Sequence, residues 1–393
     1  MVTPRQLPHA AADRAPLPGS DTTGREVKVA LVHDWLVRYR GGEKVLDAIC
    51  ELYPDADIFT LIHRPGSLPQ SLDGRRIRTS FLQRVPGIQL RYRNFLPLFP
   101  SAIASFDLQG YELIISSSHC VAKGVSKPRG ARHLSYVHAP MRYMWDRFDD
   151  YFGPGHSPPP TRMAARTIRP WLQHWDRTTA RGVDRFVANS HYIAEKVARF
   201  YGRQASVVHP PIELDTFATL PLDGLGRGNY FLWIGAPAPY KRLDVAVQAF
   251  ASLGLPLWIA GFEVRSRQSP GALAPNIRTL GEVGASELVG LYRGARAVVF
   301  TAEEDFGIVP LEAQAAGRPV IAFRGGGALE TVDSRTGMFY FPQTSEALSA
   351  AVRRFDAWER SFSPAQARAN AARFSKDAFK KRFISEVDAL LGS

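Results

Sequence analysis

Cysteine is scarce in this sequence: Cys50 and Cys120 are the two cysteines among 393 residues. There is no Cys-x-x-Cys pair and no clustered Cys/His spacing, which argues against a structural zinc site. A fold held together by several disulfides is also excluded. We expect two buried free thiols in a reducing compartment, and a disulfide between Cys50 and Cys120 is the alternative.

Long apolar runs are lacking as well. No stretch reaches the roughly 18 apolar residues that a membrane-spanning helix needs. Residues 1–26 are rich in Pro, Ala, Asp and Thr, and they lack the apolar core of a signal peptide. We therefore expect a disordered tail at residues 1–26 and a cytoplasmic protein.

The composition that is present fits a globular protein, with 45% hydrophobic and 22% charged residues. A chain well above about 300 residues usually forms more than one core, so we predict two domains. The net charge of +12 favours anionic partners such as nucleic acid, acidic lipid or phosphorylated ligands. The charge does not choose among them.

Short apolar runs alternate with amphipathic segments through residues 27–210, the predicted first domain. A strand at residues 27–33 (VKVALVH) is followed by a Gly-Gly turn and a helix at residues 43–52. Ser190 is suited to cap a helix that begins near Tyr192. This alternation predicts a parallel sheet with helices on both faces. Further strands are expected at residues 113–117, 134–138, 186–189 and 206–209.

A stretch rich in Pro and Gly follows at residues 211–228 and predicts a linker. The alternation then restarts in residues 229–374, the predicted second domain. Residues 375–393 hold an amphipathic helix that Ser375 can cap and that can cross back to the first domain. In this domain strands are expected at residues 230–235, 257–261, 277–280, 297–301 and 320–323, and helices from Lys241 and from Pro310.

These patterns predict the α/β class, with two Rossmann-like, doubly wound domains that face a cleft. In such folds ligands lie at the carboxyl ends of the strands, where helix N-termini present free N–H groups. A ligand that carries phosphate is the natural occupant.

The strongest motif is residues 301–317, TAEEDFGIVPLEAQAAG, directly after the apolar strand AVVF. Glu304 and Glu312 stand eight residues apart, so a loop carboxylate and a helix carboxylate can face one cleft. Carboxylates suit sugar diols, and Gly307 permits close backbone approach. The alternative is a capped helix with two solvated acids.

A second motif is residues 233–242, WIGAPAPYKR, also after a strand. Lys241 at a helix start is suited to anchor a phosphate, whereas an ordinary surface Lys–Arg pair is the alternative. The run GGGALE, which contains Gly326 and Glu330, follows the strand VIAF, and its free amides can face a phosphate or sugar. A simple turn is the alternative for these glycines.

Two features in the first half also carry chemistry. Gly41 and Gly42 follow the first strand and allow either backbone approach to a ligand or a tight loop. His138 stands at a strand end in the run YVHAPMRYMWD, at residues 136–146. A single histidine is more often structural, which is the alternative for His138.

Taken together, these ordered motifs resemble the retaining family-four glycosyltransferases, which have the GT-B fold, over roughly residues 27–391. The Glu-x7-Glu signature of that family implies that Glu304 contacts the donor sugar and Glu312 the nucleotide ribose. Lys241 matches the lysine that contacts the diphosphate. The runs YVHAPMRYMWD, ANSHYIAEKV and VVHPPIELDTF are similar to the branch that includes O-antigen mannosyltransferases, in which the histidine, here His138, contacts the transferred sugar.

The resemblance makes the first domain the acceptor-binding domain and the second the nucleotide-sugar-binding domain. This sequence departs from the family at Ala236, where an arginine is common. One phosphate contact is therefore missing or supplied by Arg242. The implied catalytic residues are His138, Glu304 and Lys241. The implied donor-binding residues are Gly41, Gly42, Lys241, Arg242, Glu304, Phe306, Gly307, Ile308, Glu312 and Gly326.

No metal and no cofactor beyond the nucleotide-sugar co-substrate are expected. Asp55-Ala-Asp57 reads as the D-x-D metal motif of another glycosyltransferase fold, but a turn leading into a strand is the better interpretation of PDADIFTL. Lys241, turn amides and helix dipoles would instead stabilise the charge on the diphosphate.

The resemblance thus implies a retaining hexosyltransferase (EC 2.4.1.-) that transfers mannose from GDP-mannose to a lipid-linked saccharide in surface polysaccharide or lipopolysaccharide biosynthesis. A UDP-sugar donor or a soluble acceptor is the alternative. A basic nucleic-acid-binding protein is a further one, although no helix-turn-helix, finger or RNP-like signature is present. A Rossmann oxidoreductase is disfavoured because RYRGGEKV stands where G-x-G-x-x-G would follow the first strand.

The basic stretch at residues 75–93 (RRIRTSFLQRVPGIQLRYR) mixes arginines with apolar side chains, and FLPLF follows it. Such a surface can dock on anionic lipid. We expect the protein to associate peripherally with the inner face of the plasma membrane. A solvated basic face of a globular domain is the alternative, and no nucleic-acid partner is expected.

Overall fold

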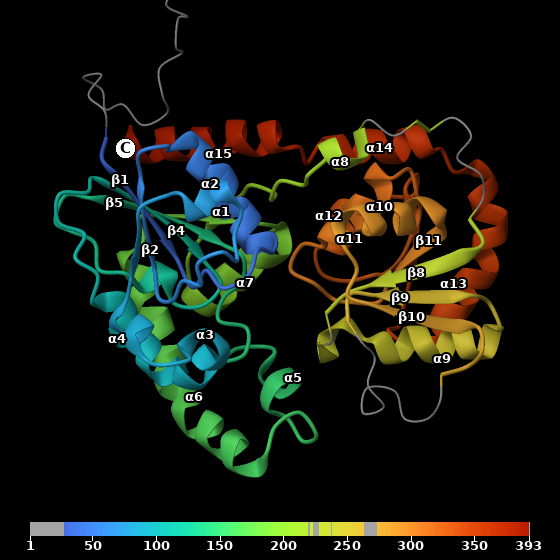
Figure 1. The fold of residues 1–393 in the computed structure, drawn as a ribbon, viewed down its shortest axis with the longest axis horizontal. Helices are drawn as coiled ribbons and strands as arrows, with labels where there is room; N and C mark the ends of the chain where they lie inside the picture. Colours follow the sequence, from blue (N-terminus) through green and yellow to red (C-terminus); the bar gives the residue numbers. More distant parts are fainter. Residues whose placement is uncertain (1–26, 219–220, 223–227, 237, 263–272, 393) are drawn as a thin grey trace, which may run out of the picture.

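The computed structural model describes residues 27–218, 221–222, 228–236, 238–262 and 273–392. The predicted tail at residues 1–26 and part of the predicted linker lie outside the described residues. The chain forms two α/β domains side by side, each built on one parallel sheet (Figure 1). The two-domain GT-B arrangement expected from the sequence is confirmed.

The first sheet has seven parallel strands in the order β3-β2-β1-β4-β5-β6-β7. Its strands are β1 (Val29–His33), β2 (Asp57–Thr60), β3 (Ile77–Thr79), β4 (Leu113–Ser118), β5 (Arg132–Val137), β6 (Arg185–Ala188) and β7 (Ala205–Val207). The α-helices between them are α1 (Gly41–Leu52), α2 (Gln70–Asp73), α3 (Ile88–Arg91), α4 (Phe99–Ala104), α5 (Phe148–Phe152), α6 (Pro159–Thr179) and α7 (His191–Tyr201). Short 3-10 turns are η1 (Phe81–Arg84), η2 (Tyr92–Leu98), η3 (Ala122–Gly124) and η4 (Ala180–Gly182).

The second sheet has six parallel strands in the order β10-β9-β8-β11-β12-β13. They are β8 (Tyr230–Ile234), β9 (Leu257–Ala260), β10 (Ile277–Gly281), β11 (Ala295–Phe300), β12 (Val320–Phe323) and β13 (Gly337–Tyr340). The helices are α8 (Asp215–Ala218), α9 (Leu243–Leu253), α10 (Ala285–Gly294), α11 (Ile308–Ala315), α12 (Ala328–Thr331), α13 (Ser345–Trp358), α14 (Pro364–Ala372) and α15 (Lys376–Leu391). The 3-10 turns are η5 (Pro239–Lys241) and η6 (Glu359–Ser361).

Both sheets are buried on both faces. Along β1, Val29 and Leu31 pack into one apolar cluster, whereas Ala30 and Val32 pack into another on the opposite face. Successive strand side chains alternate between faces, so a continuous apolar run marks a strand covered on both sides. This is why β1 was readable from the sequence, whereas β3, a less buried strand, was not predicted.

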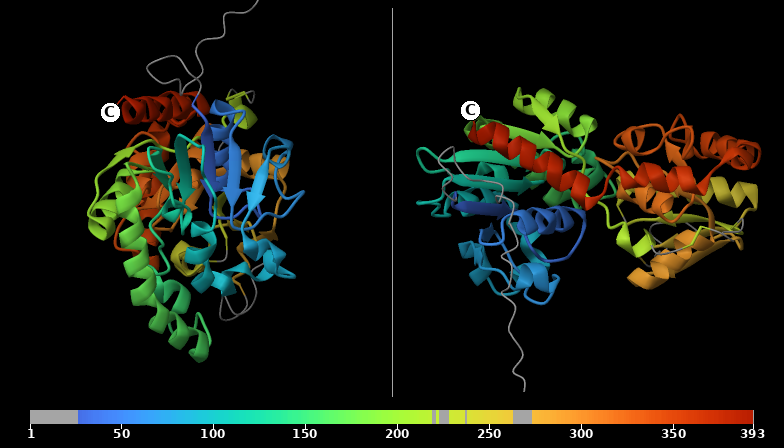
Figure 2. Two further views of the ribbon diagram at one scale, coloured as in Figure 1. Left: turned by 90° about the vertical axis from the view of Figure 1, so that its left-hand side faces the viewer. Right: turned by 90° about the horizontal axis from the view of Figure 1, so that it is seen from above.

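The last helix, α15, leaves the second domain and packs on the first, as the views from two sides show (Figures 1 and 2). Phe379, Phe383 and Val387 are buried in the same cluster as Ile49 of α1. Burial of each such side chain contributes about 1.5–3 kcal/mol, so α15 is part of the first domain's core. The predicted crossing of the C-terminal helix is confirmed, and Ser375 caps it by accepting a hydrogen bond from the Ala378 N–H at 3.2 Å.

Other local predictions have clear outcomes. Cys50 and Cys120 are both buried free thiols, as expected. Ser190 caps α7 by accepting a hydrogen bond from the Ile193 N–H at 3.1 Å. The two aspartates of the D-x-D-like run belong to different elements, because Asp55 lies in a turn and Asp57 begins β2.

Two predicted boundaries are wrong. Gly41 and Gly42 do not form a turn before the first helix but are its first two residues. The Glu43 carboxylate accepts a hydrogen bond from the Arg40 N–H at 2.9 Å, and α1 starts earlier than the glycines suggested. The helix expected from Lys241 begins at Leu243, because Arg242 has φ 50° and interrupts the helical backbone. Among the described helices, none is long and apolar enough to cross a membrane.

Candidate active site

The candidate site lies where the strand order of each sheet reverses. In the second domain this switch point is between β8 and β11, and the loops that follow these strands carry Lys241 and Glu304. The Lys241 ammonium contacts the Glu304 carboxylate directly, and both side chains are mostly buried. A topological switch point is the expected ligand crevice of an open α/β sheet. The structure therefore brings the two motifs together.

Further bonds join the same two loops. The Thr301 hydroxyl donates to the Lys241 carbonyl at 2.6 Å and accepts from the Trp233 indole N–H at 2.9 Å. Trp233 belongs to β8 and Thr301 follows β11. The backbone that carries Lys241 is thereby fixed to the loop that carries Glu304.

The Gly-rich turn after β12 packs against the backbone of Glu304. The Gly327 N–H donates to the Glu304 carbonyl at 2.8 Å. Gly326 has φ +60°, and a Cβ at this position would lie 2.4 Å from the Glu304 carbonyl oxygen. A side chain would thus push the Glu304 loop out of place, so the close approach that needs glycine here is to the protein's own loop. Whether its amides also face a ligand stays a prediction.

Glu312 lies on α11, where its carboxylate accepts a hydrogen bond from the Tyr292 hydroxyl at 2.7 Å. Burial raises the pKa of Glu312, while Tyr292 and the ammonium groups of Lys44 and Lys241 oppose the rise. Burial and the positive charges of Arg142 and Arg40 lower the pKa of Lys241 to about 7. In this setting carboxylates and cations stand close together, and their pKa values are shifted.

Three other predicted donor-binding residues lie at the start of α11. Phe306 is buried and stacks on His209 with ring centroids 5.4 Å apart, which gives it a packing role. Gly307, with φ +92°, precedes α11 and allows the sharp change of direction before the helix. Ile308 meets the first domain, since a Cβ at Gly41 would lie 3.0 Å from its Cδ1.

The Arg242 side chain does not point towards Glu304, the partner of Lys241. Its guanidinium bonds to the Asp244 carboxylate at 3.0 Å and to the Gln343 amide oxygen at 3.2 Å. Arg242 is therefore committed to neighbours in its own domain. Arg242 therefore does not take the place of the arginine that the resembled family commonly has at the position of Ala236.

In the first domain the switch point lies between β1 and β4. The completely buried Asp34 follows β1 and accepts hydrogen bonds from four consecutive backbone N–H groups after β4, at residues 119–122, over 2.6–3.0 Å. These bonds fix the loop that follows β4 against the end of β1. They resemble helix capping in that one carboxylate satisfies several free amides.

His138 follows β5 at this edge. Its Nε2 lies 2.8 Å from the Ser117 hydroxyl, which lies 3.1 Å from Nδ1 of His33. A Cβ at Gly42 would lie 3.7 Å from both the His138 and the His33 rings. Burial, with His119, His33 and Arg142 nearby, keeps the pKa of His138 well below its ordinary value. His138 is therefore neutral near pH 7.

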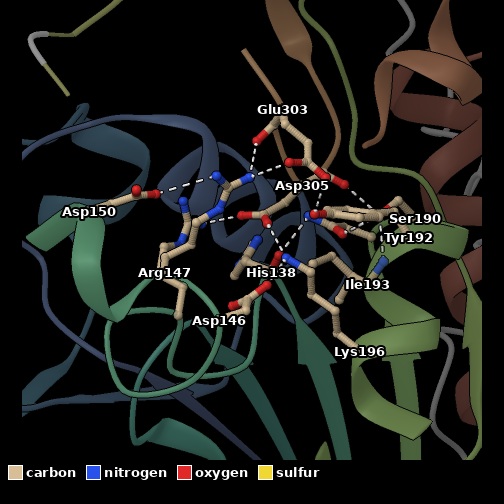
Figure 3. A network of polar contacts seen from close by, with 12 residues as sticks. His138, Asp146, Arg147, Asp150, Ser190, Tyr192, Ile193, Lys196, Glu303 and Asp305 are labelled. Atoms are coloured by element: carbon tan, nitrogen blue, oxygen red, sulfur yellow. Dashed lines mark hydrogen bonds and ion pairs between the residues drawn. The ribbon is translucent and has the colours of Figure 1, made fainter. Parts of the chain in front are cut away.

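The second domain's loop is held by side chains of the first (Figure 3). Arg147 donates to the Glu303 carboxylate at 3.1 Å, and the Tyr192 hydroxyl donates to the other Glu303 oxygen at 2.9 Å. Asp305 forms an ion pair with Arg142, and the Ser190 hydroxyl donates to its carbonyl at 2.5 Å. The residues on both sides of Glu304 are thus held by side chains of the first domain.

The N-terminus of α7 makes a further contact of this kind. The N–H groups of His191 and Tyr192 donate to the Glu330 carboxylate at 2.9 and 3.2 Å, and His209 Nε2 lies 2.9 Å from it. Burial alone would raise the pKa of Glu330, but these bonds lower it. Free amides and the positive end of a helix favour a carboxylate here. Glu330, in the predicted Gly-rich motif, joins the two domains.

In the D-x-D-like run, the Asp57 side chain makes structural contacts. The buried Asp57 carboxylate lies 2.7 Å from Nε of Arg76 and 3.1 Å from the Arg78 guanidinium, and it accepts from the Tyr111 hydroxyl. This arrangement supports the interpretation of the run as a turn and strand. The expectation that no metal takes part in the reaction stays a prediction.

Sequence reasoning missed His33, Ser117, Arg142, Glu303 and Asp305 as site residues. His33 and Ser117 are polar residues at the carboxyl ends of apolar strands, a signal that could have marked them. Arg142 and Glu303 lie inside motifs that the sequence singled out, but their pairing had no local signal, since their partners lie more than 150 residues away in the chain.

Two Rossmann-like sheets that face each other, with ligand-type residues at both switch points, have the arrangement called the GT-B fold. The comparisons agree domain by domain. Residues 39–216 match the family described as Glycosyltransferase Family 4, and residues 228–355 match the family described as Glycosyl transferases group 1. Each match covers less than half of the chain, and the two together span most of it, so both domains are similar to domains of glycosyltransferases.

Individual relatives are more distant. The D-inositol 3-phosphate glycosyltransferase of Mycobacterium sp. (strain KMS) is 32% identical over 172 residues, which are 37% of this chain and 38% of that protein. The chain thus matches less than two fifths of this relative's length. Anabaena HepE in complex with UDP has a TM-score of 0.68 at 16% identity, and sucrose-phosphate synthase of Thermosynechococcus elongatus has 0.64 at 18%. Both structures are covered completely and cover 93% of this chain, so they share its fold.

Proposed function

We propose that this protein transfers a hexose from a nucleoside diphosphate sugar to an acceptor hydroxyl with retention of anomeric configuration. The observation that carries the proposal is the pairing of Lys241 with Glu304 at the switch point of the second sheet. His138 lies at the facing edge of the first sheet beside Gly42, and the neighbouring Gly41 lies against Ile308 of the second domain. A cleft with an ammonium for phosphate and a carboxylate for sugar hydroxyls suits such a donor.

In the proposed reaction the Lys241 ammonium and backbone amides stabilise the departing diphosphate as the bond between the sugar carbon and the phosphate oxygen breaks. The acceptor hydroxyl forms the new glycosidic bond from the same face, and its proton passes to the departing diphosphate. Glu304 orients the transferred sugar through its hydroxyls. Glu312, on α11, is the candidate for the ribose, and no side chain is required as a covalent nucleophile.

For the donor and acceptor we propose GDP-mannose and a lipid-linked saccharide used in surface polysaccharide biosynthesis. This proposal rests on the resemblance of the run around His138 to the O-antigen mannosyltransferase branch. A UDP-sugar is the alternative donor, because the structurally similar HepE binds UDP-glucose. A soluble acceptor is the alternative to the lipid-linked one.

A lipid-linked acceptor would require the protein to reach a membrane surface. The exposed side chains of the basic stretch and its continuation support this: Phe81, Leu90 and Leu98 are apolar and lie among Arg84, Arg91 and Arg93. Leu90 is 81% exposed. In contrast, Arg75, Arg76 and Arg78 bond to the protein itself. We propose that the exposed six residues dock on the anionic inner face of the plasma membrane.

The direct test is a thermal-shift screen of the full chain against GDP-mannose, UDP-glucose, other nucleotide sugars and a duplex DNA. A ligand at a hundredfold excess over its dissociation constant should stabilise the folded state by about 2.7 kcal/mol. Stabilisation by one nucleotide sugar, with release of its nucleotide when acceptor is added, is the expected result. Stabilisation by DNA alone would instead favour a nucleic-acid-binding protein.

A further inference from the structure

A chain of polar contacts connects His138 with an acidic side chain that the proposed reaction does not use. Nε2 of His138 lies 2.8 Å from the Ser117 hydroxyl, which lies 3.1 Å from Nδ1 of His33. Nε2 of His33 lies 3.7 Å from the Glu43 carboxylate. His33 and Ser117 are partners in the register of β1 and β4, so the sheet itself aligns the middle of this chain.

The Ser117 hydroxyl restricts where the protons can be. A serine hydroxyl has one proton, so between two imidazole nitrogens it donates to one and accepts from the other. Ser117 is buried, and no water-exposed alternative is open to it. When both rings are neutral, one of the two facing nitrogens carries a proton and the other is bare.

Glu43 determines the direction of the two hydrogen bonds that Ser117 makes. One of its oxygens accepts from the Arg40 N–H at 2.9 Å at the start of α1, and the other faces His33. Burial alone would raise the pKa of Glu43, but the contact with His33 lowers it, so the carboxylate is ionised. A negative charge 3.7 Å from Nε2 of His33 favours the proton on that nitrogen. Nδ1 of His33 is then bare and accepts from Ser117, and Ser117 accepts from His138.

We propose that Glu43, His33 and Ser117 are positioning residues that hold His138 with a proton on Nε2 and a bare Nδ1, so that the ring offers a hydrogen-bond acceptor to a hydroxyl of the transferred sugar. The ligand in this inference rests on the proposed function. The tautomer does not, because it is a property of the free protein. His138 remains partly exposed, and Gly42 beside it has no side chain that would cover the ring.

The tautomer can be measured by nitrogen NMR of the full chain with ¹⁵N-labelled histidine at pH 8, above the ordinary pKa of an imidazole. His138→Asn and His33→Asn variants assign the two sets of signals. The expected result is a pyrrole-type Nε2 and a pyridine-type Nδ1 for His138, with a mixed or reversed population in Ser117→Ala and Glu43→Gln. A protonated Nδ1 of His138 in the natural protein, or an unchanged tautomer in Ser117→Ala, would overturn the proposal.

Ser135→Ala is the matched control. Ser135 lies in the neighbouring strand β5, and its buried hydroxyl has no hydrogen-bond partner among the described residues. With the sugar donor found in the screen, Ser117→Ala should lower kcat/KM roughly tenfold, and Ser135→Ala should not. The expected tautomer without turnover of any donor would contradict the proposed function alone. Turnover with the reversed tautomer would contradict this inference alone.

Discussion

Arg142 and Asp305 form an ion pair that joins the loop after β5 in the first domain to the loop after β11 in the second. Although burial alone would lower it, the Asp305 carboxylate raises the pKa of Arg142. Lys196 of α7 lies 3.9 Å from the same carboxylate. Since Asp305 is adjacent to Glu304, this pair couples the position of a proposed sugar contact to the closeness of the two domains.

We therefore expect Asp305→Asn to open the cleft. The substitution keeps the shape of the side chain but removes a charge-assisted contact of about 1.5–3 kcal/mol. Small-angle scattering should show a larger radius of gyration and denaturation a lower stability. Asp150→Asn is the control, since Asp150 pairs with Arg147 within the first domain at 3.3 Å. Equal dimensions for both variants and the natural protein would contradict a role of the pair in closure.

Glu304→Gln should lower transfer at least roughly 10²-fold while nucleotide binding survives. The amide keeps the size of the side chain but loses the carboxylate that would orient the sugar and balance Lys241. Initial rates of transfer and calorimetric binding of nucleotide measure the two effects separately. Glu303→Gln, which alters the contacts to Arg147 and Tyr192, should cost less. Unchanged turnover in Glu304→Gln would refute the assignment.

Lys241→Ala should weaken binding of the nucleoside diphosphate roughly tenfold or more and leave the nucleoside almost unaffected. The reason is that an ammonium contributes through charge-assisted bonds to phosphate oxygens. Calorimetry with GDP and guanosine, or with the uridine pair, makes the comparison. Equal losses for both ligands would argue against a phosphate contact. Ala236→Arg should tighten nucleoside diphosphate binding if the loop is arranged as in the resembled family.

The lowered pKa of Lys241, about 7 in the free protein, predicts a pH dependence of donor binding. A bound diphosphate raises this pKa, so binding takes up a proton above pH 7. Affinity should be highest below pH 7 and fall as the pH rises through 7 towards 9. An intact nucleotide sugar is the suitable ligand, because its diphosphate does not titrate in this range. Lys241→Arg, whose charge is permanent, should give a flat profile, and the same slope in both proteins would contradict the assignment.

Membrane docking should depend on the charges of Arg84, Arg91 and Arg93. Each basic residue near an anionic surface contributes about 1 kcal/mol, screened within a Debye length, so binding to anionic vesicles should fall with salt. Replacement of all three by Glu should abolish cosedimentation without unfolding the protein. The same change at Arg353, Arg354 and Arg360, exposed in the second domain, is the control. Equal binding to neutral and anionic vesicles would leave the stretch as an ordinary solvated face.

The elements that could be read from the sequence are those whose determinants are local or continuous. The buried strand β12 coincides with the apolar run at residues 320–323, and the helices capped by Ser190 and Ser375 begin where expected. Helix α6 was not predicted. It contains Pro170, and only Ala165, Leu172 and Asp176 are buried in 21 residues, so few apolar positions mark its inner face.

For the candidate site the division is similar. Lys241 and Glu304 were recognised because each follows a strand in a motif, and the switch point brings them together. The interdomain contacts of Arg142 and Glu303 depend on how two separate sheets face each other, which no local pattern records. Nor does a local pattern record why residue 326 is glycine, since the reason is the close approach of the Glu304 backbone rather than a ligand.

The return of α15 to the first domain means that the chain passes between the domains twice, before β8 and again between α14 and α15. The two passages lie side by side, since the Ile212 N–H donates to the Phe374 carbonyl at 3.0 Å. A paired connection of this kind permits bending about one axis and resists twisting or separation. A single protease cut within residues 211–228 would therefore leave both halves attached through α15, and the nicked protein would still migrate as one particle.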